Sequence, residues 1–265
     1  MVQKPLNAER NENTVSEKID RRAFVSGGVA LASATLLSGS AEAAKKNRKV
    51  VCWSEGTAPK NIYPNDINTA IAEGLKPLKG WDVSTASIND SEQGLPDSVL
   101  NDTDVLIWWG HQRHGDVKDE LVARITKRVK EDGMGFIATH SAHYSKALKS
   151  ILGTNCGWKY YIDDGADLKV IVKAPKHPIC KGVVDFDVPH TERYGDPFEV
   201  PPPETVLFDG IYSKPEGEHA QQGMVWTIGK GRVFYFQPGH EGYPIYFQEE
   251  IRHVFRNGVQ WVAKK

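Results

Sequence analysis

The chain has 265 residues, with 33 basic and 34 acidic side chains and a hydrophobic content of 40%. These values are ordinary for a globular protein and exclude a disordered chain, a collagen-like fibre and a polytopic membrane protein. The near-neutral charge, without a basic run, argues against a nucleic-acid binder. The three cysteines form no CxxC pair and no disulfide framework, so we expect structural roles for Cys52, Cys156 and Cys180.

Residues 1–43 resemble a twin-arginine export signal. Arg21 and Arg22 precede a mild apolar stretch that ends in the A-x-A site at 41–43. This stretch is too short, and too rich in Gly, Ser and Ala, to form a stable membrane anchor. The resemblance implies that the twin-arginine machinery exports the folded protein to a bacterial periplasm. Residues 44–265 then form one mature domain, which is long enough for a single core.

The first half of this domain predicts alternating strands and helices. Apolar runs predict strands at 49–53, 105–109 and 135–139, of which the last two are expected to be buried, and 81–87 is a further strand candidate. Helical spacing of apolar residues predicts one helix that begins after Asn65 or Asp66 and another over about 118–131. This rhythm indicates an α/β fold with three α/β/α layers around a doubly wound, mostly parallel sheet.

The second half is less regular. It predicts a strand at 168–172, an extended segment at 201–203, a hairpin formed by 224–228 and 232–237, and a final amphipathic helix. We expect the segment 189–195, bounded by Pro and Gly, to be a loop that supplies the carboxylate of Glu192.

Histidines gather where the predicted strands end. Five of the nine directly follow strands: His111 and His114 after the third, His140 and His143 after the fourth, and His240 after the last. Ligands of open α/β sheets bind beyond the carboxyl ends of the strands. Because imidazole and carboxylate groups bind zinc and similar ions, we expect a divalent metal site there, with zinc as the expected ion. His177, His219 and His253 have surface or structural positions, and His190 is left open.

Aromatic residues flank the same loops and have two interpretations. They are Trp53, Trp108, Trp109, Tyr194 and Tyr243. Such rings suit the apolar faces of sugars, but they also pack in cores. Trp108 and Trp109 are consecutive on a strand and face opposite sides, so at least one is expected in the core.

Four motifs follow one another along the mature domain: Trp-Trp-Gly-His-x-x-His from Trp108, Thr-His-Ser-Ala-His from Thr139, Glu-x-Tyr-Gly from Glu192 and Pro-Gly-His-Glu from Pro238. Together they resemble the trehalose-utilisation (ThuA-like) family. The resemblance covers residues 48–263 and implies the flavodoxin-like sheet of class I glutamine amidotransferases.

Glutamine hydrolysis itself is not expected from this chain. It needs a cysteine nucleophile at the strand-to-helix elbow, where this chain has His140 and Ser141. Ser141 stays an alternative nucleophile, although it lacks the flanking Gly-x-Ser-x-Gly pattern.

The resemblance implies a role in the catabolism of trehalose and related disaccharides, with 3-keto sugars as substrates. A carbonyl at C3 acidifies the hydrogen at C2, and a divalent ion on the carbonyl oxygen would stabilise the enediolate. A nearby histidine or carboxylate removes the proton and returns it. The outcome is isomerisation, or elimination of the group at C1.

The hypothesis assigns the side chains to three roles. The metal ligands are His111, His143, Glu192 and His240, with His114 as a further candidate; His140 and Glu241 transfer protons, and Tyr194 donates to a substrate oxygen. Two rival functions are a non-catalytic sugar-binding module and a metal-dependent hydrolase. A homo-oligomer is left open.

Overall fold

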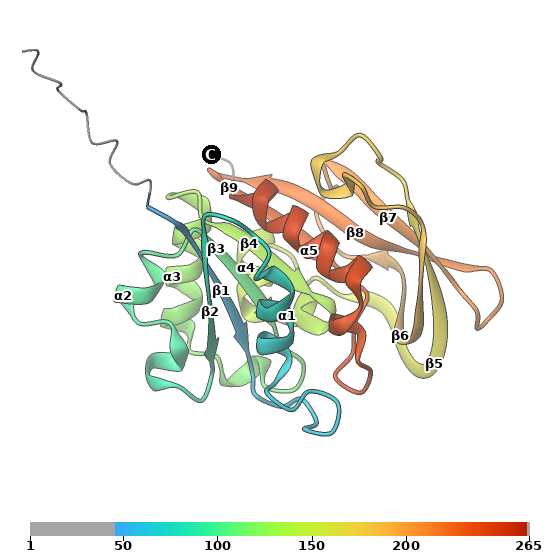
Figure 1. The fold of residues 1–265 in the computed structure, drawn as a ribbon, viewed down its shortest axis with the longest axis horizontal. Helices are drawn as coiled ribbons and strands as arrows, with labels where there is room; N and C mark the ends of the chain where they lie inside the picture. Colours follow the sequence, from blue (N-terminus) through green and yellow to red (C-terminus); the bar gives the residue numbers. More distant parts are fainter. Residues whose placement is uncertain (1–45, 264–265) are drawn as a thin grey trace, which may run out of the picture. The chain divides into compact units, whose positions relative to one another are not determined.

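The computed structural model describes residues 46–263, which fold around one nine-stranded sheet (Figure 1). The export signal expected at residues 1–43 lies outside the described residues, as do residues 264–265. The strands are β1 (Arg48–Ser54), β2 (Trp81–Ser87), β3 (Val105–Trp109), β4 (Gly135–Thr139), β5 (Trp158–Val172), β6 (Phe186–Phe198), β7 (Thr205–Tyr212), β8 (Glu218–Ile228) and β9 (Gly231–Phe236). The helices are α1 (Ile67–Leu75), α2 (Asp97–Leu100), α3 (Asp119–Lys130), α4 (Lys146–Leu152) and α5 (Glu249–Val262).

One half of the sheet is parallel, as predicted. Its strands lie in the order β2-β1-β3-β4-β9, and every pairing among them is parallel. All residues of β3 and β4 are buried, because helices cover both faces and leave no solvent side for polar residues. Asp66 caps α1, as expected, by accepting the N–H of Ile67.

The other half is antiparallel and corrects two predictions. The sheet continues in the order β9-β8-β7-β5-β6, with antiparallel pairings throughout. Within residues 46–263 the two kinds of pairing are equal in number, so the prediction of a mostly parallel sheet is wrong. The segment 189–195 is also not a loop, because it is the middle of β6. β6 lies at the edge of the sheet, where the missing N–H of Pro189 is tolerated.

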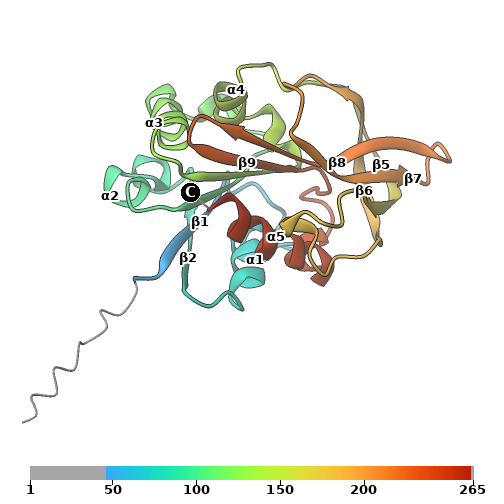
Figure 2. The same cartoon turned by 90° about the horizontal axis from the view of Figure 1, so that it is seen from above.

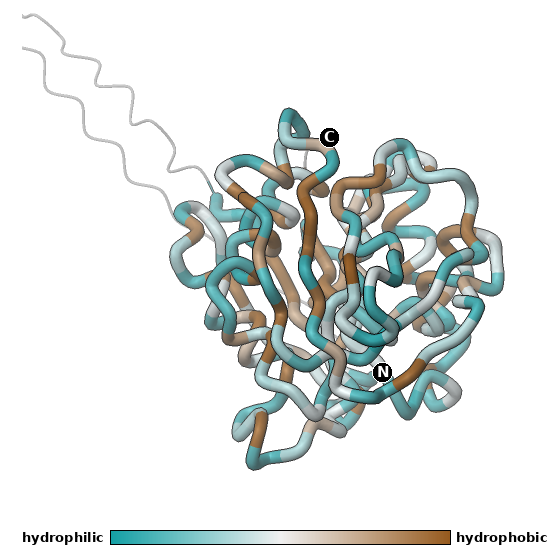
Figure 3. The backbone as a smooth tube through the Cα atoms, turned by 90° about the vertical axis from the view of Figure 1, so that its right-hand side faces the viewer, coloured by the Kyte–Doolittle hydropathy of each residue, from teal (hydrophilic) through white to brown (hydrophobic). Residues whose placement is uncertain are grey.

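The parallel half has helices on both faces and a separate hydrophobic core on each. Figure 2 shows α1 and α5 on one side of the sheet, and α2, α3 and α4 on the other. Trp109 belongs to the core beside α1 and α5, whereas Trp108 belongs to the opposite core and stacks on Trp53, with ring centroids 3.6 Å apart. Hydrophobic stretches, brown in Figure 3, run through the strands in the interior. No helix among residues 46–263 has the length and apolar character needed to cross a membrane.

Candidate metal centre

The carboxyl ends of β3, β4 and β9 lie side by side, because β4 pairs in parallel with both of the others. Each of these strands is followed by a loop or turn that carries a histidine. The ring centroids of His111 and His240 are 5.4 Å apart, and those of His140 and His240 are 5.9 Å apart. The sheet therefore brings together three histidines from distant parts of the chain.

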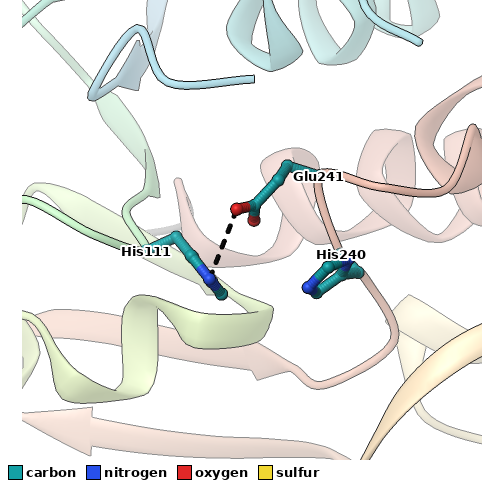
Figure 4. A group of neighbouring side chains, drawn as sticks. All are labelled: His111, His240 and Glu241. Carbon is teal, nitrogen blue, oxygen red and sulfur yellow. Dashed lines mark ion pairs between the residues drawn. The ribbon is translucent and has the colours of Figure 1, made fainter. Parts of the chain in front are cut away.

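Two overlapping groups of side chains have a geometry that can hold a metal ion. One is His111, His240 and Glu241 (Figure 4), and the other is His111, His140 and Glu192; within each group the ligand atoms lie within 4.8 Å of one another. Figure 4 shows Glu241 pointing toward His111, with its Oε1 3.3 Å from the Nε2 of His111. Histidine nitrogen and carboxylate oxygen are donors that zinc accepts. His111 is common to both groups.

His140 is held firmly in the second group. It follows β4 directly and has a positive φ of 47°, a conformation that is uncommon outside glycine and that marks functional sites. Its Nδ1 lies 2.9 Å from the carbonyl oxygen of Gln237, so Nδ1 carries the proton and donates it there. A Cβ at Gly239 would lie only 2.5 Å from the Cβ of His140, so the next loop can approach His140 because it has glycine there.

The other nitrogen of His140 faces two oxygen atoms. Its Nε2 lies 2.9 Å from Oε2 of Glu192 and 3.1 Å from the hydroxyl of Tyr194. Because Nδ1 already holds the proton of the neutral ring, the contact between Nε2 and the carboxylate requires a positive centre. That centre is either a proton shared by the ring and the carboxyl group or a metal cation bound by both groups.

Glu192 and Tyr194 reach the site from β6. Burial alone would raise the pKa of Glu192, but the hydrogen bond and charge of His140, with the charge of His240 and the Tyr194 hydroxyl, lower it to about 2. Burial raises the pKa of Tyr194 well above its ordinary value. Glu192 is therefore ionised and Tyr194 is a neutral hydroxyl at physiological pH, which suits a ligand and a hydrogen-bond donor, respectively.

His240 has the opposite hydrogen-bond pattern from His140. Its Nδ1 accepts the backbone N–H of Gly242 at 3.0 Å, so in the neutral ring the proton lies on Nε2. That Nε2 is 3.9 Å from a carboxylate oxygen of Asp163, whose other oxygen accepts the hydroxyl of Tyr243. The neutral ring of His240 presents an N–H at Nε2, whereas a metal ion needs a lone pair there.

Glu55 is a site residue that the sequence analysis missed. It follows β1, is fully buried, and its Oε2 accepts three consecutive backbone N–H groups, those of His111, Gln112 and Arg113, each at 2.8 Å. These three bonds fix the loop that carries His111. Its position directly after a predicted strand was the one sequence signal that could have identified Glu55. Its partners are backbone N–H groups, which any residue type provides, so they form no recognisable sequence motif.

His114 and His143 lie beside the two candidate metal-binding groups and belong to neither. Neither of the groups found among residues 46–263 includes these two side chains. Both line a pocket of about 390 Å³, together with His111, Ser141, Tyr144, Tyr161 and Tyr194. His143 donates its Nδ1 proton to the carbonyl of Cys156 at 2.6 Å, which leaves the Nε2 lone pair of its neutral ring unprotonated.

Ser141 and the cysteines give no sign of a glutaminase-like nucleophile. The Ser141 hydroxyl donates to the carbonyl of Gly110 at 2.7 Å and is buried. Cys52, Cys156 and Cys180 are buried, and burial raises the pKa of each thiol, so none has the character of a thiolate.

We expect His143 to make the stability of the fold sensitive to acid. Burial lowers the pKa of His143 to about 3, whereas a histidine in the unfolded chain titrates near ~6.5. Between these two pKa values the unfolded state binds a proton at His143 and the folded state does not. The contribution of neutral His143 to the free energy of unfolding is therefore fully present above pH ~6.5 and falls as the pH drops toward 3. On acidification from pH 7 to pH 5, we expect a His143→Gln variant to lose about 2 kcal/mol less unfolding free energy than the wild type.

Urea unfolding at the two pH values, with a chelator present, measures this difference. Glutamine retains a donor for the Cys156 carbonyl but does not titrate. Equal losses in the two proteins would show that His143 does not control the acid sensitivity.

Comparison with known proteins identifies the family. Residues 49–262 match the family model of ThuA, which is described as trehalose utilisation. The chain belongs to the ThuA family. A comparison with curated proteins finds no match.

Solved structures agree with the ThuA assignment at the level of the fold. ThuA-like proteins from Parabacteroides merdae and Bacteroides uniformis have TM-scores of 0.61 and 0.59, identities of 16% and 17%, and alignments that cover 82% and 84% of this chain and 90% and 94% of theirs. A Salmonella typhimurium protein, described as a cytoplasmic protein, has a TM-score of 0.55 at 14% identity, covering 82% of this chain and 100% of its own. At these identities the likeness shows the fold alone.

Proposed function

We propose that this ThuA family member is a metal-dependent enzyme that acts on a sugar. The observation that carries the proposal is the 2.9 Å contact between Nε2 of His140 and Glu192, at a ring whose other nitrogen is already committed to a carbonyl. A divalent cation satisfies this contact, and His111 supplies a third ligand atom within reach. Zinc accepts such a set of nitrogen and oxygen donors.

The proposed ligands are His111, His140 and Glu192. A ligating histidine usually donates its second ring N–H to a carbonyl or carboxylate, as His140 does to Gln237. When bound, the ion would polarise a carbonyl oxygen of the substrate. This assignment exchanges the roles expected for His140 and His240, and it leaves His114 and His143 as residues of the pocket wall.

Proton transfer falls to Glu241, as the sequence analysis expected. Within the described part of the chain its Oε2 is buried and has no hydrogen-bond partner, whereas its Oε1 is held by Gln112 at 3.0 Å and His111 at 3.3 Å. A carboxylate held through one oxygen offers the other as a base. His240, with its N–H at Nε2, and the hydroxyl of Tyr194 are donors for substrate oxygens.

A 3-keto glycoside suits these groups. Glu241 would take the proton from C2, next to the C3 carbonyl. The electron pair of the broken C2–H bond would move toward that carbonyl. Return of the proton at C3, with the proton of the C2 hydroxyl passing to the C3 oxygen, gives the 2-keto isomer; alternatively, the group at C1 leaves with the electron pair and takes up the proton that Glu241 removed from C2. The description of the family as trehalose utilisation and the sugar-compatible rings of the pocket support this substrate class.

Metal analysis and product detection together test the proposal. The purified chain should hold about one zinc per molecule, and NMR should detect isomerisation or elimination of a 3-keto disaccharide that stops with chelator and returns with zinc. Absence of stoichiometric metal, with turnover unchanged by chelator, would overturn it. Binding without turnover would instead identify a sugar-binding module, and cleavage of simple glycosides would identify a hydrolase.

We propose that the parallel half corresponds to the flavodoxin-like core of class I glutamine amidotransferases. We also propose that residues 1–43, with Arg21 and Arg22, direct export to the periplasm. Replacing both arginines by lysine should retain the protein inside the cell, which fractionation of a bacterial host would detect.

A further inference from the structure

A continuous wall of aromatic rings borders the pocket beside His111. Tyr161 meets Tyr194 edge to face at 6.5 Å, and Tyr194 meets His143 at 5.1 Å, measured between ring centroids. The wall continues from His143 to Tyr144 at 5.9 Å, and from Tyr144 to His114 at 5.9 Å. Residues from β5, β6 and the two histidine-bearing segments after β3 and β4 thus form one surface.

The two outer tyrosines of this wall are exposed. Tyr161 is 71% exposed and Tyr144 is 54% exposed, whereas Tyr194 between them is 2% exposed. The large hydrophobic side chains exposed among residues 46–263 are few, and two of the five, Tyr144 and Tyr161, line this pocket; the others are Ile162, Val184 and Phe247. Exposed aromatic rings gathered at a pocket mouth indicate a binding surface rather than incomplete packing.

Both outer rings are attached to well-positioned backbone. Tyr161 lies directly opposite Tyr194 in the β5–β6 pairing, so the two side chains share a face of the sheet. Tyr144 ends the turn that begins at His140, and the ammonium group of Lys149 lies 3.1 Å from its ring centroid. The rings are therefore presented by a preformed surface and need little ordering when a ligand binds.

We propose that Tyr144 and Tyr161 form a subsite for the second pyranose ring of a disaccharide, whose first ring lies in the pocket against His111 and Tyr194. The inference rests on the proposed function and assigns residues to the second sugar of its disaccharide substrate, the sugar that forms the leaving group. The pocket has a volume of about 390 Å³, and its exposed tyrosines lie at the mouth, where a second ring attached to the first would come into contact with them. The apolar faces of a pyranose suit such rings.

Binding of two uncharged sugars tests the subsite. Calorimetry would compare trehalose with methyl α-D-glucopyranoside, using the full zinc-loaded chain, its Tyr144→Ala, Tyr161→Ala and Tyr161→Phe variants, and Phe247→Ala as an exposed aromatic away from the pocket. We expect the wild type to favour trehalose. Each alanine variant should weaken trehalose binding by about 2- to 10-fold and leave the glucoside unchanged. Tyr161→Phe and Phe247→Ala should resemble the wild type.

The outcomes separate this inference from the function on which it rests. A wild type that binds both sugars equally, or alanine variants that weaken both equally or neither, would overturn the subsite and leave a monosaccharide site. A wild type that binds neither sugar would overturn the proposed sugar site together with the subsite. Because Tyr161 is mostly exposed, its variants should keep the wild-type circular dichroism spectrum.

Discussion

Replacing His111 by alanine should weaken zinc binding by more than ~100-fold and abolish turnover, because this side chain belongs to both groups that can hold the ion. Loss of a direct ligand has a larger effect than loss of the groups that orient ligands, which alone weaken affinity by ~10- to 100-fold. Competition with a chromophoric chelator measures the affinity. His219→Ala provides the control, since His219 lies on β8 and is largely exposed. Unchanged affinity in His111→Ala would place the ion elsewhere.

Two further variants show which of the two overlapping groups binds the ion. His140→Ala should lose zinc like His111→Ala, because its Nε2 lone pair faces Glu192. His240→Ala should retain zinc and lose turnover, because the hydrogen bond from Gly242 places the ring proton on Nε2. The reverse result, with zinc lost only in His240→Ala, would assign the ion to the group with Glu241.

Replacing Glu55 by alanine should lower the free energy of unfolding by about 4 kcal/mol. The substitution leaves the backbone N–H groups of His111, Gln112 and Arg113 without their acceptor, and hydrogen bonds to a charged group contribute ~1.5–3 kcal/mol each, less than additively. Glu55→Gln keeps one acceptor oxygen and should lose about 2 kcal/mol. Urea unfolding measures both, with Glu216→Ala, an exposed loop residue, as the control.

Zinc affinity distinguishes a positioning role of Glu55 from a purely structural one. If the three bonds set the place of His111, Glu55→Gln should weaken zinc binding at temperatures where the variant is fully folded. A Gly110→Ala substitution should act in the same direction, because a Cβ there would lie 2.8 Å from Oε1 of Glu55. A destabilised Glu55→Gln variant with wild-type zinc affinity would limit Glu55 to stability.

The parallel half was predictable because its central strands, β3 and β4, are buried on both faces. Burial forces continuous apolar runs such as 105–109 and 135–139, and the structure confirms both as strands with the predicted bounds. The antiparallel half has one long edge strand, β6, that includes Pro189 and Gly195, residues normally typical of loops. Its pairing with β5 is tertiary information that no local pattern contains.

The location of the candidate site could be predicted from the sequence, but the role of each residue in it could not. The rule that ligands bind beyond the carboxyl ends of strands brought His111, His140 and His240 to one edge. The division into ligands and proton carriers depends on which ring nitrogen of each histidine carries the proton. A backbone group determines this in both rings: Nδ1 of His140 donates to the carbonyl of Gln237, whereas Nδ1 of His240 accepts the N–H of Gly242. Such backbone partners are invisible in a sequence because every residue carries them.

The residues that surround the candidate ion are spread along almost the whole domain. His111 and His140 are made early, but Glu192 comes from β6, and the carbonyl that holds His140 belongs to Gln237, just after β9. A nascent chain therefore cannot retain the ion until nearly the whole domain has left the ribosome and folded. If residues 1–43 direct export of the folded protein as proposed, loading would follow synthesis and precede translocation, and the metal supply of the producing compartment would then determine which ion the protein carries.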